Sequence, residues 1–138
     1  GKGGIGKSMT ASHISYAFAK KGKNVIHMGC DPKHDSTRLL LEGRMQSAIL
    51  DVLLQNEFRP EDITIDDVVC ESPLSKQCSG HIYCAESGGP PPGTGCSGKG
   101  VTEAIKTLRN MDVDNVFDLD VVLYDVLGDV VCGGFAMP

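Results

Sequence analysis

This chain lacks the features of a membrane-spanning or nucleic-acid-binding protein. Its longest apolar run is far shorter than the roughly 20 residues that a membrane-spanning helix needs. It has no long basic stretch, and 13 Lys and Arg stand against 18 Asp and Glu, which gives a net charge of −5. We therefore expect neither a membrane nor a nucleic acid as its main partner. A secretory signal is also missing, so we expect a cytoplasmic protein.

The ends of the chain lack two further pieces. There is no initiator Met, and the glycine-rich motif that opens the sequence has no strand before it. Such a motif normally connects a buried strand to a helix, and that strand sits inside a parallel sheet. We therefore expect residues 1–138 to form one truncated domain, without its first strand and its C-terminal part. The composition, 41% hydrophobic and 22% charged, is that of an ordinary globular domain.

The opening motif is G-x-x-x-x-G-K-S, the phosphate-binding P-loop. Its glycines let backbone N–H groups turn toward phosphate oxygens, Lys7 reaches the β- and γ-phosphates, and the Ser8 hydroxyl ligates Mg²⁺. A helix that begins at about Ser8 directs its positive end at the same anion. Lys2 lies too near the loop's start to fold back easily, but it could reach a nucleotide on a facing subunit. The expected nucleotide-binding residues are Gly1, Lys2, Gly3, Gly4, Ile5, Gly6, Lys7 and Ser8.

A second segment completes the nucleotide site. Residues 119–124 read as a buried hydrophobic strand that delivers Asp125, the Walker B arrangement in which a carboxylate holds Mg²⁺ directly or through water. Asp31 and Asp35 follow another short strand, where parallel α/β folds place ligand-binding loops, and Asp129 follows Asp125. These three carboxylates could position the attacking water or the waters of Mg²⁺. Helix capping and turn formation are the alternative roles of Asp31 and Asp35.

Hydrophobic periodicity predicts the other elements. We expect helices at residues 8–21, 44–55 and 100–110, and strands at residues 24–28 and 119–124. In the first helix the aligned apolar residues are Ala11, Ile14, Ala17 and Phe18, with Gly22 as the C-cap. Residues 56–69 read as a connector with a short strand or helical turn, and residues 70–99 as loop-rich. The order predicts an α/β P-loop NTPase, a mostly parallel sheet flanked by helices.

Six cysteines are many for a cytoplasmic chain, and beside a P-loop they indicate metal or redox chemistry rather than disulfides. Cys96 and Cys132 each lie among glycines, which let backbone amides approach the sulfur atoms of a cluster. Two chains would together supply four thiolates; two buried structural cysteines are the alternative. The spacing of Cys78, His81 and Cys84 could ligate zinc but matches no common finger, so we favour an irregular loop there.

Four segments together resemble the nitrogenase iron protein (dinitrogenase reductase) family: GKGGIGKS, GCDPKHDSTR, CAESGGPPPGTGCSGKG and YDVLGDVVCGGFAMP. The resemblance covers nearly the whole chain and identifies it with the N-terminal half of such a protein. It implies a homodimer with one [4Fe-4S] cluster on the two-fold axis, ligated by Cys96 and Cys132 of each chain. It also implies MgATP as the second cofactor.

The resemblance also implies roles at the nucleotide. Lys2 matches the lysine that reaches across the dimer, Asp31 and Asp35 fall in switch I, and Asp129 acts with the lysine in activating water. MgATP hydrolysis then gates one-electron transfer from the cluster to a separate catalytic nitrogenase protein, with ferredoxin or flavodoxin as the electron donor. On this interpretation the chain is the ATP-hydrolysing reductase component of nitrogen fixation.

Departures from that pattern leave two alternatives open. With His34 in place of the usual Ala, DPKHDST is similar to the iron protein of light-independent protochlorophyllide reductase, whereas Arg38 is nitrogenase-like. Lys99 stands where some nitrogenase iron proteins have an arginine that can be ADP-ribosylated. Met9 stands where the family usually has a threonine. One alternative is therefore a divergent iron protein that serves a tetrapyrrole, methylthio-alkane or cofactor F430 reductase. The other is an ATPase switch of the ParA/MinD kind with no redox role, a class that shares the P-loop and Lys2 but that Cys96 and Cys132 among glycines argue against.

Overall fold

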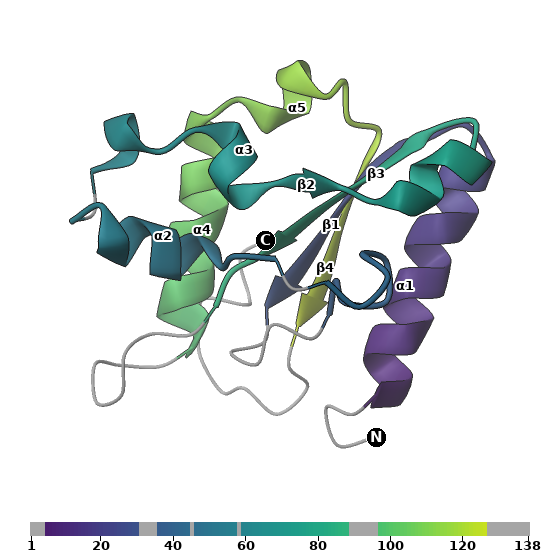
Figure 1. Ribbon diagram of the computed structural model, residues 1–138, viewed down its shortest axis with the longest axis horizontal. Helices are drawn as coiled ribbons and strands as arrows, with labels where there is room; N and C mark the ends of the chain where they lie inside the picture. The colour runs from purple at the N-terminus through teal and green to yellow at the C-terminus, as the bar shows by residue number, and fades with distance from the viewer. Residues whose placement is uncertain (1–4, 31–35, 45, 58, 89–96, 127–138) are drawn as a thin grey trace.

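The computed structural model describes residues 5–30, 36–44, 46–57, 59–88 and 97–126, except for the side chains at residues 5–8, 60, 97–101 and 126. Its centre is a four-stranded sheet in the order β2-β3-β1-β4 (Figure 1). The strands β1 (Asn24–Cys30), β3 (His81–Glu86) and β4 (Val121–Val126) are parallel, and β2 (Cys70–Glu71) is antiparallel to β3. This arrangement confirms the predicted α/β fold with a mostly parallel sheet.

Helices cover both faces of the sheet (Figure 1). The helix α1 (Ile5–Lys20) packs on one face, and α2 (Ile49–Gln55), α4 (Ser97–Asn110) and α5 (Val113–Val116) lie on the other. The short helical turns are η1 (Pro60–Asp62), α3 (Ile65–Val68) and η2 (Pro73–Gln77). Among the described residues, no helix combines the length and apolar character that crossing a membrane requires.

The helix α1 differs from expectation at its start and in its buried face. It begins at Ile5 rather than at about Ser8, and Gly22 closes it as predicted, with φ of +89° and its N–H bonded to Ala19 at 3.0 Å. The predicted apolar face is wrong, because Ile14 and Phe18 are 43% and 36% exposed. The residues buried against the sheet are instead Ser12, Ser15 and Ala19. A polar helix face thus meets the sheet.

Other predicted elements need smaller corrections. The helix at 44–55 begins only at Ile49, because Ala48 is extended and bridges to Glu86 of β3. The helical turns within 56–69 and the helix near 100–110 are confirmed. The loop-rich interpretation of 70–99 is wrong for β3, which is an inner strand. The strand predicted at 119–124 is present but lies two residues later, as β4, so that Asp125 is inside the strand. It is not fully buried, since Val122 is 43% exposed at the edge of the described sheet.

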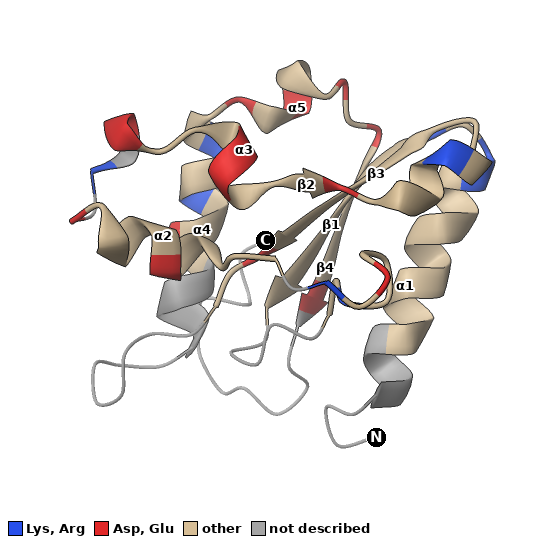
Figure 2. Cartoon of the chain, viewed as in Figure 1, with Lys and Arg blue, Asp and Glu red and all other residues tan. Residues whose placement is uncertain are grey.

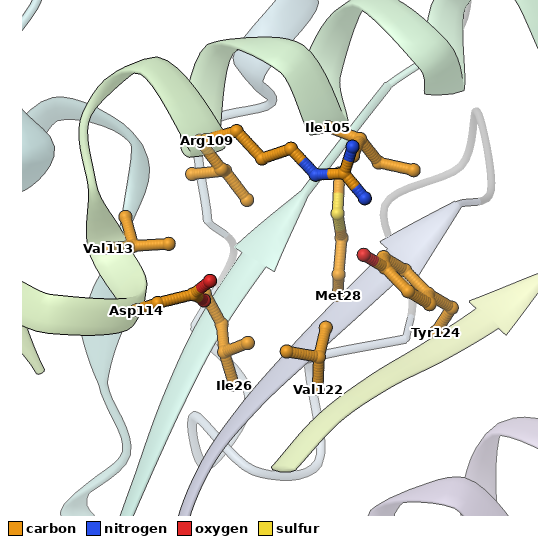
Figure 3. A pocket seen from close by; sticks show the side chains of 9 residues that line it. Ile26, Met28, Ile105, Arg109, Val113, Asp114, Val122 and Tyr124 are labelled. Carbon is orange, nitrogen blue, oxygen red and sulfur yellow. The ribbon is translucent and has the colours of Figure 1, made fainter. Parts of the chain in front are cut away.

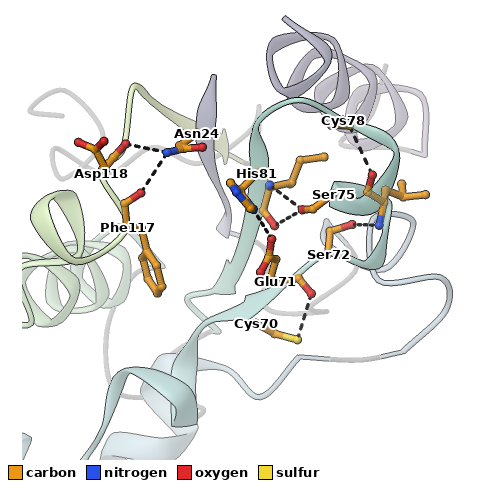
Figure 4. Close-up of polar contacts among 11 residues, drawn as sticks. Asn24, Cys70, Glu71, Ser72, Ser75, Cys78, His81, Phe117 and Asp118 are labelled. Carbon is orange, nitrogen blue, oxygen red and sulfur yellow. Dashed lines mark hydrogen bonds and ion pairs between the residues drawn. The ribbon is translucent and has the colours of Figure 1, made fainter. Parts of the chain in front are cut away.

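At the amino end of the sheet, Asn24 fixes how β1 and β4 align. Its backbone N–H donates to Asp120 Oδ2 at 2.9 Å, and its side-chain amide donates to the carbonyls of Phe117 at 3.3 Å and Asp118 at 3.1 Å (Figure 4). The parallel register that follows pairs Gly29 of β1 with Asp125 of β4 at the other end. This register brings Asp125, the predicted Walker B residue, level with the end of β1.

Candidate functional site

Two buried carboxylates flank Gly29 at the carboxyl end of the sheet. Glu86 of β3 and Asp125 of β4 both pair with Gly29, one from each side, and both are at most 5% exposed. The acidic end of β4 is visible in Figure 2. Parallel α/β folds bind ligands at this edge, beyond the carboxyl ends of the strands. We therefore take this edge as the candidate site.

Two consecutive residues bridge the carboxylates. The Ser36 hydroxyl donates to Asp125 Oδ2 at 2.6 Å, while Thr37 donates its backbone N–H and its hydroxyl to Glu86 Oε2 at 3.0 and 2.9 Å. Gly29 leaves the room for this, because a Cβ there would lie 1.9 Å from Glu86 Oε1 and 2.6 Å from Ser36 Cβ. Ser36 and Thr37 are thus held against the ends of both strands that neighbour β1.

His27 extends this contact toward α1. It lies on the same face of β1 as Gly29, two residues earlier, with Nε2 2.8 Å from Ser36 Oγ and Nδ1 2.8 Å from Ser15 Oγ. The imidazole is fully buried. Burial lowers the pKa of His27 to about 4, although the nearby charge of Asp125 acts in the opposite direction. His27 is therefore neutral near pH 7.

Among the predicted site residues, Asp125 is the one with a side chain in the described part of the chain. The residues Ile5, Gly6, Lys7 and Ser8 form the first turn of α1, and α1 packs against β1 and β4. The predicted residues outside the described part of the chain are Gly1, Lys2, Gly3, Gly4, Asp31, Asp35, Cys96, Asp129 and Cys132. Their roles stay predictions. A buried carboxylate at this edge suits Mg²⁺, which prefers oxygen ligands.

The segments that carry the predicted cluster cysteines follow two strands of this edge. Beyond Glu86 the ladder continues, since the Ser87 N–H donates to the Gly29 carbonyl at 2.8 Å, and the chain then runs toward Cys96. The strand β4 ends at Val126, before Cys132. In the sequence, Cys96 thus follows β3 and Cys132 follows β4, the two strands that flank β1 and whose ends carry the buried carboxylates.

The polar residues that surround Asp125 were not predicted from the sequence. His27 had no assigned partner, and Ser15, Ser36 and Glu86 had no assigned role. The available signal was a histidine in the middle of NVIHMGC, an otherwise apolar strand. A polar group that is buried in this way must find hydrogen-bond partners, so its neighbours across the fold are polar as well.

Two other places do not compete as the nucleotide site. A cavity of about 110 Å³ lies between α4 and the sheet (Figure 3), well below the roughly 300–1,000 Å³ of small-molecule sites. It is lined mainly by core residues, among them Ile26 and Met28. Near η2, His81 Nδ1 pairs with Glu71 Oε2 at 2.6 Å (Figure 4), and no three potential ligands gather into a metal site in the described residues.

Known proteins that resemble this chain point to one family. The family model for 4Fe-4S iron sulfur cluster binding proteins of the NifH/frxC family matches residues 1–138. Three curated relatives are light-independent protochlorophyllide reductase iron-sulfur ATP-binding proteins. That of Rhodobacter capsulatus is 50% identical, and those of Rubrivivax gelatinosus and Jannaschia sp. are 49% identical.

Each of these alignments covers the whole chain but only 42% or 43% of the relative, so the chain spans less than half the length of these proteins. The match confirms the resemblance to nitrogenase-type iron proteins and the [4Fe-4S] cluster as the family's cofactor. It also agrees with the parallel α/β sheet whose carboxyl edge holds Asp125. With the family match extending over every residue, the chain belongs to the NifH/frxC family of 4Fe-4S iron–sulfur cluster binding proteins.

Proposed function

We propose that this chain is the ATP-binding iron–sulfur component of a nitrogenase-like reductase whose catalytic protein reduces protochlorophyllide. The observation that carries the proposal is 49–50% identity along the whole chain to three proteins of that name. His34 in DPKHDST points the same way. These findings favour the tetrapyrrole alternative over nitrogen fixation, which the sequence alone had placed first.

Within the proposal, the nucleotide lies on residues 1–8 of one chain. Ser8 and Asp125 hold Mg²⁺, while Lys2 reaches in from the second chain of a homodimer. Asp31 and Asp129 orient the attacking water, and Asp35 assists at the nucleotide. The buried position of Asp125, level with Gly29 across the β1–β4 ladder, supports its part in this arrangement.

Cys96 and Cys132 of both chains would hold the [4Fe-4S] cluster, which would supply one electron at a time. Electrons arrive from ferredoxin or flavodoxin and leave to the catalytic protein. The contact between Ser36 and Asp125 supports coupling, because a shift of the buried carboxylate on nucleotide hydrolysis acts on β4 and on the segment after β1 together. The continuation of β4 leads to Cys132.

The test uses the natural protein, reconstituted anaerobically with iron and sulfide. With the catalytic component of a light-independent protochlorophyllide reductase, we expect protochlorophyllide reduction that requires MgATP. Cys96→Ala and Cys132→Ala should each abolish the electron paramagnetic resonance signal of the reduced cluster. Cys70→Ala, at a partly exposed cysteine outside the predicted ligand set, is the matched control and should keep it.

Two results would contradict the proposal. One is acetylene reduction with the catalytic component of nitrogenase, together with no protochlorophyllide reduction with the catalytic component of protochlorophyllide reductase. This result would favour a role in nitrogen fixation. A wild-type protein that hydrolyses ATP but takes up no cluster would instead support an ATPase switch of the ParA/MinD kind.

A further inference from the structure

A line of four hydrogen-bonding side chains crosses the interior from α1 to β4. It runs from Ser15 of α1 to His27 of β1, then to Ser36 and on to Asp125. Its three contacts measure 2.8, 2.8 and 2.6 Å, and each residue is at most 5% exposed. The line connects α1, which begins within the predicted phosphate-binding motif, with the carboxylate near the carboxyl end of β4.

The direction of these hydrogen bonds is fixed by counting protons. Ser36 has one hydroxyl proton and donates it to Asp125 Oδ2, so its oxygen must accept from His27 Nε2. The imidazole therefore carries its proton on Nε2 and accepts at Nδ1, where Ser15 is the donor. Every proton in the line points toward Asp125.

Burial keeps this direction stable. It lowers the pKa of His27 to about 4, so at neutral pH the ring is uncharged and can accept at Nδ1 while it donates at Nε2. An apolar residue at position 27 would leave Ser36 without this donor, and its hydroxyl would be free to rotate away from Asp125. The histidine thus has a defined task in a strand whose other residues are mostly apolar.

We infer that His27 is a positioning residue of the nucleotide site, which orients the Ser36 hydroxyl and through it holds the Asp125 carboxylate in place for a divalent cation. The part that concerns the cation rests on the proposed function. The direction of the hydrogen bonds rests on the structure alone. His27 does not touch the nucleotide or the cation; it acts through Ser36.

Two substitutions separate this role from simple core packing. The amide nitrogen of Gln reaches the place of Nε2, so His27→Gln keeps the donor to Ser36. Asn is shorter and reaches only the place of Nδ1, so His27→Asn keeps the contact with Ser15 and loses the one with Ser36. A control is Ser12→Ala, which removes another buried hydroxyl of α1 whose contact, with the Ser36 carbonyl, is long at 3.5 Å.

The first measurement is cation affinity, using Mn²⁺ in place of Mg²⁺. The natural protein is saturated with ADP, and free Mn²⁺ is followed by electron paramagnetic resonance. In His27→Asn and in Ser36→Ala we expect the Kd of Mn²⁺ to rise about 10- to 100-fold, the range found when groups that orient metal ligands are removed. We expect His27→Gln and Ser12→Ala to stay near the wild-type value. Affinity for ADP without a metal should not change in any of them.

The second measurement is independent of any bound cation. Nitrogen-15 chemical shifts of the imidazole ring, assigned by their loss in His27→Gln, should show the proton on Nε2 at neutral pH. A proton on Nδ1, a charged ring, or a His27→Asn variant with wild-type Mn²⁺ affinity would overturn the inference. So would equal weakening in His27→Gln and His27→Asn, which is what a packing role alone predicts.

Failure of the proposed function looks different. If the wild-type protein bound neither ADP nor Mn²⁺, the proposed nucleotide site would be wrong, and so would the positioning role of His27 at that site. The Nε2 proton would still be observed in that case, since Ser15, Ser36 and Asp125 impose it without a ligand.

Discussion

Thr37 donates two hydrogen bonds to one oxygen of Glu86, from its backbone N–H at 3.0 Å and from its hydroxyl at 2.9 Å. Both residues are fully buried, and they lie 49 positions apart in the sequence. The contact joins the segment after β1 to the end of β3. Because the continuation of β3 carries Cys96, this pair links the two segments that are expected to serve the nucleotide and the cluster.

Glu86→Ala should destabilise the fold by about 2–5 kcal/mol, because two buried donors of Thr37 lose their acceptor. Unfolding in urea, followed by circular dichroism, measures this loss. Glu86→Gln is the matched control, since it keeps an oxygen that accepts both bonds and should lose clearly less. Equal losses in the two variants would mean that the carboxylate matters for a reason other than accepting from Thr37.

Gly29→Ala should also destabilise the protein, by about 1–3 kcal/mol or more, because the new methyl group has no room. Its Cβ would lie 1.9 Å from Glu86 Oε1 and 2.6 Å from Ser36 Cβ. Shortening Glu86 removes the first of these clashes, so Gly29→Ala combined with Glu86→Ala should cost less than the sum of the two single changes. Strict additivity in the same urea measurement would show that the methyl group does not meet Glu86.

Cys84 should resist alkylation in the native protein. It is fully buried in β3, and burial, followed by the neighbouring Cys70 and Glu86, raises the pKa of its thiol far above the usual range. Iodoacetamide labelling at pH 8, read by mass spectrometry, should leave Cys84 unmodified until urea is added. Cys70, which is partly exposed, is the internal reference. Modification of Cys84 at the rate of Cys70 would show that β3 opens readily.

The fold was predictable where the signal is local. The helix α1, the strand β1 and the strand that carries Asp125 each follow from a run of neighbouring residues or from a motif of fixed spacing. The strand β3 was missed because HIYCAE contains one β-branched residue, Ile82, while buried parallel strands usually read as runs of Val, Ile and Leu. Its place inside the sheet depends on partners that are distant in sequence.

The candidate site was predictable to a smaller extent, for the same reason. Asp125 follows from the Walker B pattern, but Ser36 meets it across 89 positions, and no local pattern joins the two. The buried face of α1 was assigned to Ile14 and Phe18 from periodicity alone. Ser12 and Ser15 lie there instead, and Ser15 is the partner that the buried His27 requires. A polar interior reverses the usual rule that apolar residues mark the core face.

The same histidine gives the protein a predictable response to acid. In the unfolded chain His27 titrates near 6.5, and in the fold burial lowers its pKa to about 4, so between these values the unfolded state binds the additional proton. The contribution of His27 to the free energy of unfolding is therefore complete above about pH 6.5. It is lost as the pH falls toward 4, and the total loss is about 3 kcal/mol. Urea unfolding at half-unit pH steps measures it. His27→Gln has no group that titrates there and should show a flatter profile over that range, whereas an equal slope in both proteins would assign the acid sensitivity to other residues.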